Sequence, residues 1–89
     1  MYRIMASKGR KSAILEKDGE FYGSIGPERI YRLSEKDLRP ISKISLEEAI
    51  KGDFIPHDPP TEIERFEDWP DAAVAYEARL QTTAPHAAD

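Results

Sequence analysis

The segment SAILEKDGEFYGSI, residues 12–25, decides the fold class because it contains the strongest hairpin signal in the chain. Two strand-like apolar runs, 12–16 and 21–25, flank the dipeptide Asp18-Gly19. A two-residue type I′ turn requires positive φ at both central positions, which Asp tolerates and Gly adopts freely. The segment therefore predicts two antiparallel strands joined by a tight turn at 18–19.

Further strands are predicted on both sides of this hairpin. Residues 2–6 have strand character and are joined to 12–16 by the polar, flexible link 7–11. Gly26-Pro27 predicts a turn that leads into a fourth candidate strand, 29–33. We therefore expect a small antiparallel β-meander of three to five strands with one face on a thin core.

Short helical segments follow the predicted meander. Ser34 precedes 35–37 in the pattern of a single capped turn, since a serine hydroxyl can accept from a free backbone N–H. Ser45 is the predicted N-cap of a short helix over 46–51 that ends at Gly52. This helix has under two turns, so packing rather than intrinsic propensity must stabilise it.

The chain changes character at Pro56-His57-Asp58-Pro59-Pro60. Residues 1–55 carry 11 Lys and Arg against 9 Asp and Glu, a net charge of +2, whereas residues 56–89 carry 2 against 8, a net charge of −6. The predicted fold is α+β, with a small antiparallel sheet plus one short helix over 1–55, a proline linker over 56–60, an acidic amphipathic helical arm over 61–80 and a flexible tail over 81–89.

The acidic arm has the pattern of a helix with one apolar face. Thr61 and Glu64 are spaced as a capping box, and Pro70 favours a helix start at 68–70, since proline is tolerated in a first turn. Apolar residues then recur at helical spacing: Trp69, Ala73, Tyr76 and Leu80. We expect residues 1–60 to fold without this arm.

The arm is the first candidate for a binding site, because acidic residues alternate in it with large aromatic ones. The residues predicted to contact a partner protein are Phe66, Trp69, Tyr76, Leu80, Glu62, Glu64, Glu67, Asp68 and Asp71. An apolar helical stripe can dock in a partner's groove while the acids meet its basic rim. A sharper version is that the arm mimics nucleic acid in a basic channel. The alternative is that the stripe folds back and completes the chain's own core.

A basic loop near the first hairpin is the second candidate. Its residues are Arg3, Lys8, Arg10 and Lys11, with Tyr22 and Tyr31 on nearby strands. Cations that contact phosphates and aromatic rings that stack on bases are typical of single-strand nucleic-acid binding. The alternative is a solvated hairpin tip whose lysines protect a sheet edge. The overall charge of −4 disfavours non-specific DNA binding by the whole chain.

No pattern in the sequence specifies a reaction, a metal or a cofactor. The chain has no cysteine and two histidines, and His57 is expected in an exposed linker. We identify neither a serine–histidine pair nor a glycine-rich phosphate loop. With no signal-peptide h-region and no run of ~20 apolar residues, we expect a soluble cytoplasmic protein. The sequence thus predicts a small non-catalytic protein-binding regulator, adaptor or inhibitor without cofactor.

Overall fold

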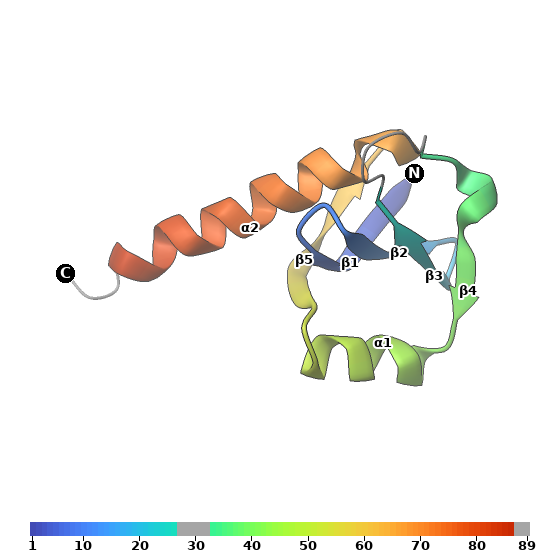
Figure 1. Ribbon diagram of the computed structural model, residues 1–89, viewed down its shortest axis with the longest axis horizontal. Helices are drawn as coiled ribbons and strands as arrows, with labels where there is room; N and C mark the ends of the chain where they lie inside the picture. The colour runs from blue at the N-terminus through green and yellow to red at the C-terminus, as the bar shows by residue number, and fades with distance from the viewer. Residues whose placement is uncertain (27–32, 87–89) are drawn as a thin grey trace.

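The computed structural model describes residues 1–26 and 33–86, with side chains as far as Gln81, and has a small α+β fold (Figure 1). The described residues form, in chain order, β1 Tyr2–Lys8, β2 Ser12–Lys17, β3 Glu20–Ile25, the 3-10 turn η1 Glu35–Asp37, β4 Arg39–Ile41, α1 Lys43–Lys51, β5 Ile55–Ile63, the 3-10 turn η2 Phe66–Asp68 and α2 Trp69–His86. None of the described helices is long and apolar enough to cross a membrane.

The five strands form one antiparallel sheet in the order β4-β3-β2-β1-β5. The predicted meander is present as β1, β2 and β3. Asp18 and Gly19 have φ angles of 54° and 86°, as the predicted type I′ turn requires. The strand predicted for 29–33 falls, except for Leu33, outside the described residues, and β4 occupies the place beside β3.

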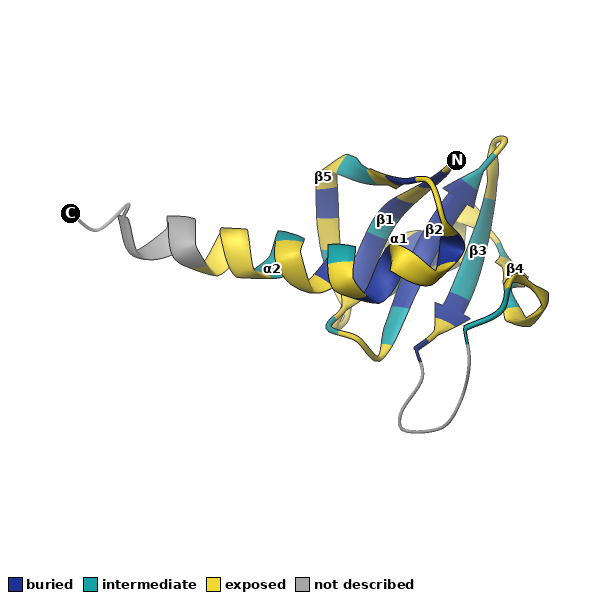
Figure 2. Ribbon diagram, turned by 90° about the horizontal axis from the view of Figure 1, so that it is seen from above, coloured by how far each residue is buried: buried dark blue, intermediate teal, exposed yellow. Residues whose placement is uncertain are grey.

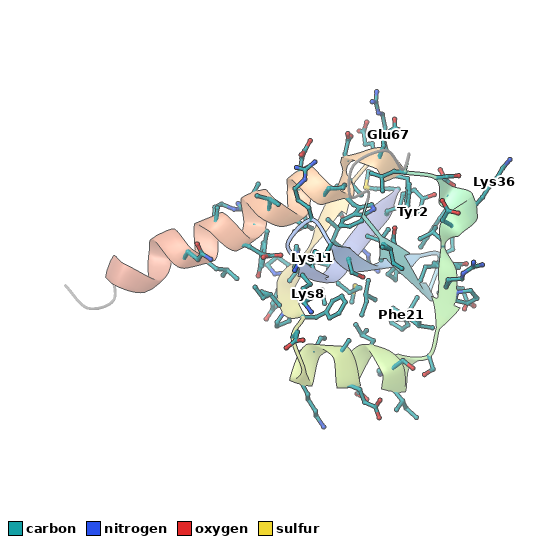
Figure 3. All side chains as sticks on the ribbon, in the orientation of Figure 1. Tyr2, Lys8, Lys11, Phe21, Lys36 and Glu67 are labelled. Atoms are coloured by element: carbon teal, nitrogen blue, oxygen red, sulfur yellow. The ribbon has the colours of Figure 1, made fainter. Side chains whose placement is uncertain are left out.

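Apolar side chains lie on both faces of this sheet. On the first face they pack with residues from β5 onward in a cluster of Tyr2, Ile4, Ala13, Leu15, Ile63, Phe66, Trp69 and Ala73. On the second face Ala6 and Ile14 pack with Leu46 of α1, and the half-buried Phe21 points into the same layer (Figure 3). The apolar cluster on each face of the sheet therefore includes residues of a helix, α2 on the first face and α1 on the second.

An irregularity in β1 decides which side chains reach the first face. Ile4 pairs with Leu15, but Ala6 pairs with Ile14, so one extra residue interrupts the register between them. Because side chains alternate along a strand, one extra residue exchanges the two faces from that point on. Ser7, paired with Ala13, consequently lies on the same face as Ile4 and is fully buried.

The predicted helix caps are confirmed at Ser34 and Gly52, and the predicted N-cap Ser45 is wrong. Ser34 accepts from the N–H of Lys36 at the start of η1, and Gly52 caps the end of α1. The start of α1 lies one turn earlier than predicted. Ser42 is the N-cap and accepts from the N–H of Ser45 over 3.1 Å, because its side chain rather than that of Ser45 faces the free amides.

Residues 56–60, predicted as a linker, lie inside β5, which pairs antiparallel with β1. The prolines of this stretch are tolerated because β5 is an edge strand, where an amide donor is not required on the outer side. Thr61, predicted as a helix cap, is also a β5 residue and pairs with Ile4. The next pair along is Pro56 with Ala6, so residues 57–60 bulge away from the ladder opposite Met5.

Helix α2 begins at Trp69 with Pro70 in its first turn, as predicted, but continues to His86 through the residues predicted to be a flexible tail. Alanine is frequent in this helix and has the highest helix propensity of any residue. α2 extends away from the sheet and runs along the longest dimension of the molecule, 45 Å (Figure 1). Its buried residues lie next to the sheet, and the described residues from Ala78 to Gln81 are exposed (Figure 2).

Candidate functional site

Two of the residues predicted to bind a partner lie instead in the protein's own core. Phe66 is 4% exposed and Trp69 0%, and the ring of Phe66 packs edge-on against Tyr2 with 5.8 Å between centroids. Their side chains are therefore unavailable as surface anchors. The apolar stripe does fold back, as the alternative proposed, but only along its first turns, because α2 leaves the sheet before it reaches Leu80, which is 43% exposed.

The acidic residues of the predicted partner site are exposed, and three of them have basic partners. Arg65 Nε lies 3.1 Å from Glu67 and 3.9 Å from Asp68. Asp71 accepts from Arg10 over 2.6 Å. The carboxylates of Glu62 and Glu64 are also on the surface, and Glu67 projects outward from η2 (Figure 3). Two cations of the same chain, Arg10 and Arg65, thus offset part of the local negative charge.

Three of the four basic residues of the predicted nucleic-acid site are likewise engaged with carboxylates. Lys8 pairs with Asp53 over 3.2 Å, and Arg10 pairs with Asp71. Lys11 is exposed, and Tyr22 is half-buried. The remaining aromatic residue of this prediction, Tyr31, lies outside the described residues.

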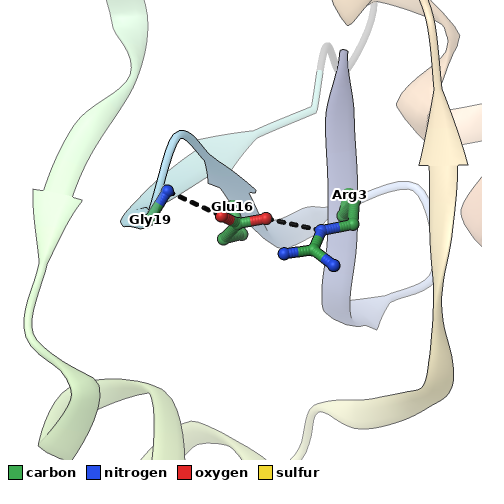
Figure 4. Close-up of polar contacts among 3 residues, drawn as sticks. All are labelled: Arg3, Glu16 and Gly19. Carbon is green, nitrogen blue, oxygen red and sulfur yellow. Dashed lines mark hydrogen bonds and ion pairs between the residues drawn. The ribbon is translucent and has the colours of Figure 1, made fainter.

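Arg3 is part of the hairpin rather than of a free basic surface. Its Nε donates to Glu16 over 2.6 Å, and the other oxygen of Glu16 accepts from the N–H of Gly19 over 2.7 Å (Figure 4). The hydrogen bond from Arg3 lowers the pKa of the Glu16 carboxyl below its usual range, and the Gly19 amide lowers it further. This carboxylate therefore ties the type I′ turn to β1, which is a structural role.

The structure brings together a polar cluster that the sequence did not reveal. We call it the His57 cluster; its members are Ser7 of β1, His57 and Thr61 of β5, and Tyr76 and Glu77 of α2. The irregularity of β1 directs Ser7 toward α2, and the bulge of β5 brings His57 opposite to it. Ser7 is 0% exposed and His57 4%, so the centre of the cluster lies beneath α2.

Every polar group at the centre of the cluster has a hydrogen-bond partner. Ser7 Oγ lies 2.7 Å from His57 Nε2 and donates to Glu77 Oε2 over 2.6 Å. The same Glu77 oxygen accepts from the N–H of Gly9 over 2.9 Å. His57 Nδ1 lies 2.8 Å from Thr61 Oγ1. Buried polar groups are costly unless paired, so this arrangement stabilises the contact between α2 and the sheet.

Tyr76 closes the cluster from the side of α2. Its ring stacks on the imidazole of His57, with 3.9 Å between centroids and an interplanar angle of 15°. Its hydroxyl accepts from the N–H of Asp58 over 2.9 Å. The guanidinium carbon of Arg79 lies over the Tyr76 ring, 5.7 Å from the ring centroid. Tyr76 was predicted as a partner contact, but it is half-buried against its own sheet.

The hydrogen bonds place one ring proton of His57, and burial decides whether the ring carries a second. Ser7 gives its single proton to Glu77, so its oxygen accepts from Nε2–H of the ring. The other nitrogen, Nδ1, lies 2.8 Å from the Thr61 hydroxyl and accepts from it when the ring is neutral. Burial lowers the pKa of His57 to about 4, with Glu77 opposing this shift and Arg79 adding to it. The prediction of an exposed linker histidine is therefore wrong.

The arrangement does not favour nucleophilic catalysis, although it contains the serine–histidine pair that the sequence did not reveal. In an activated serine the imidazole accepts the hydroxyl proton. Here the imidazole donates to Ser7, and the serine proton is directed to Glu77. Ser7 is also fully buried. Within the part of the chain that the structure describes, no group of three or more His, Asp or Glu is placed to hold a metal ion.

A weak sequence signal for the cluster existed in the alternation of β5. Ile55 and His57, and again Thr61 and Ile63, are spaced two apart, as side chains on one face of a strand are. The prolines between them obscured this pattern.

The sequence matches no protein-family model, and comparisons with curated proteins and with solved structures find no match.

Proposed function

We propose that this protein is a small non-catalytic protein-binding module, an adaptor, regulator or inhibitor, that presents the distal segment of α2 to a partner. We define the root of α2 as residues 69–73 and its distal segment as residues 76–86. The observation that carries the proposal is the course of one helix: Trp69 and Ala73 are 0% exposed, whereas Leu80 is 43% exposed beyond the sheet.

A helix that is fixed at one end and free at the other is suited to docking in a groove. Helix-in-groove recognition uses apolar side chains three or four residues apart, and its affinity benefits when the helix is ordered before binding. The root and the His57 cluster supply that order here. The binding residues of the proposal are accordingly Leu80 and its neighbours along the distal segment, with the exposed acids Glu62 and Glu64 as steering charges.

Nucleic-acid mimicry by the acidic surface is a less favoured form of this proposal, because three of its carboxylates are paired with Arg65 or Arg10. Direct nucleic-acid binding by the basic loop is less favoured for the corresponding reason: Arg3, Lys8 and Arg10 all have acidic partners. A cytoplasmic location belongs to the proposal as well, since a chain without cysteine is compatible with a reducing compartment.

The experiment compares two exposed apolar positions on different helices. A photo-crosslinking amino acid is placed at Leu80, or at Ile44 of α1, which is 68% exposed and serves as the matched control. The full chain is then irradiated in cells of its source organism. The proposal expects one discrete protein adduct from position 80 that the substitution Val74→Glu or Gln81→Glu weakens, and none from position 44.

Equal adducts from both positions, or no adduct from position 80, would contradict the proposal. The melting temperature of each variant is measured first, so that loss of binding is not confused with loss of folding. Both positions are exposed, and substitutions at such sites usually change stability by less than about 0.5 kcal/mol.

A further inference from the structure

His57 lies where three elements of the fold meet. Both of its ring nitrogens have hydrogen-bond partners, and its ring is stacked on an aromatic side chain. Its Nε2 faces Ser7 of β1, its Nδ1 faces Thr61 of β5, and its ring is covered by Tyr76 of α2. The ring is 4% exposed. The distal segment of α2 therefore reaches the sheet chiefly through contacts that include or adjoin this one imidazole.

An added proton would disturb this arrangement at a defined atom. Nε2 already carries a proton in the neutral ring, so the second proton arrives at Nδ1, which lies 2.8 Å from Thr61 Oγ1 and accepts from it in the neutral state. The charged ring would lie buried and near Arg79, and both conditions are unfavourable. Glu77 is the opposing charge, but one of its oxygens is already occupied by Ser7 and Gly9.

The polar and charged groups around the ring come from all three elements. β1 contributes Ser7, β5 contributes Thr61 and the exposed Asp58, and α2 contributes Tyr76, Glu77 and Arg79. The root of α2 is held differently, because its buried contacts are those of Trp69 and Ala73 in an apolar cluster. Its ion pair from Asp71 to Arg10 is exposed. Protonation of His57 thus acts on the distal segment and leaves the buried apolar contacts of the root unchanged.

We propose that the His57 cluster is an acid-sensitive latch, in which protonation of His57 releases the distal segment of α2 from the sheet while the root stays docked. This inference concerns the chain alone and holds whether or not a partner protein binds α2.

The direction of the effect follows from linkage. In the released state His57 is solvated and titrates near its ordinary value of about 6.5, whereas in the latched state its pKa is about 4. The released state then binds more protons between these values, so the latch is at full strength above about pH 6.5 and weakens as the pH falls toward 4. Between pH 7 and pH 5 the opening equilibrium should increase about 20-fold.

The test is amide hydrogen exchange on the full chain at pH 7 and pH 5, corrected for intrinsic exchange rates. Protection of the amides at 76–80 should fall about 20-fold in the wild type, while that of Ile4 and Leu15 in the sheet changes much less. His57→Gln retains hydrogen-bonding capacity without a titrating group and should abolish the pH dependence. His86→Gln, at the other histidine of the chain, is the matched control and should behave as the wild type.

The proposal is overturned if protection at 76–80 is independent of pH in the wild type, or if the sheet amides lose protection to the same extent, which would make His57 a residue of global stability. Should His57→Gln fail to fold, ring nitrogen chemical shifts of the wild type decide the question. They should report a neutral ring protonated at Nε2 at pH 6. A charged ring or the opposite tautomer at that pH would also overturn the latch.

Discussion

The root and the distal segment of α2 belong to one helix but are attached to the sheet by different physics. Trp69 and Ala73 of the root are buried among apolar side chains. The distal segment is attached through hydrogen bonds of Glu77 and Tyr76 to Ser7, Gly9 and the backbone of Asp58. Apolar burial is non-directional and insensitive to pH, whereas the polar contacts depend on geometry and protonation. One helix can therefore combine a permanent attachment with a conditional one.

The severest test of the root is to remove it. A chain that ends at residue 60 loses Ile63, Phe66, Trp69 and Ala73, half of the first apolar cluster. The expectation from sequence that residues 1–60 fold alone is replaced by the opposite one, because a small domain has little core to spare. We expect narrow amide dispersion and no cooperative thermal transition for 1–60. A cooperative melt of this fragment would show that the root is dispensable.

A single substitution tests the same region less drastically. Trp69→Ala should cost about 3–5 kcal/mol of unfolding free energy, since the side chain is 0% exposed and leaves a cavity. Denaturant titration measures the loss. Trp69→Phe is the control and should retain more stability, because the indole Nε1 has no hydrogen-bond partner among the described residues. Full stability of Trp69→Ala would mean that the tryptophan is not part of the core.

The smallest effect is expected in the distal segment. Glu77→Ala leaves the Ser7 hydroxyl and the Gly9 N–H without their acceptor and should cost about 1–3 kcal/mol. Glu77→Gln keeps an acceptor oxygen and should cost less. Denaturant titration gives the global loss, and hydrogen exchange at 76–80 shows whether it is local. If Glu77→Ala destabilised the protein as much as Trp69→Ala, the division between root and distal segment would fail.

Local patterns in the sequence predicted the elements whose causes are local. The type I′ turn at Asp18-Gly19, the capped turn after Ser34 and the proline in the first turn of α2 each depend on neighbouring residues only. The meander followed from the same signals. The five-residue stretch from Pro56 to Pro60 was misread as a linker because proline content indicates a break, and pairing with β1 overrides that indication at a sheet edge.

The candidate site could be predicted only in part. Tyr76 and Leu80 were identified from their helical spacing, but spacing alone does not tell where a helix leaves the sheet. Ser7, His57 and Glu77 are 50 and 20 residues apart along the chain. Their meeting depends on two register irregularities, one in β1 and one in β5, for which the residues themselves carry little signal.

The sequence by itself determined the α+β class, the hairpin and the amphipathic C-terminal helix, because turn chemistry and periodicity act over a few residues. Only the tertiary structure decided that Trp69 is core rather than surface and that His57 is buried and neutral rather than exposed. It also decided that Arg10 of the basic loop pairs with Asp71 of the acidic arm. These properties depend on which residues distant in the chain come into contact, and a shift of one residue in strand register exchanges the buried and exposed faces.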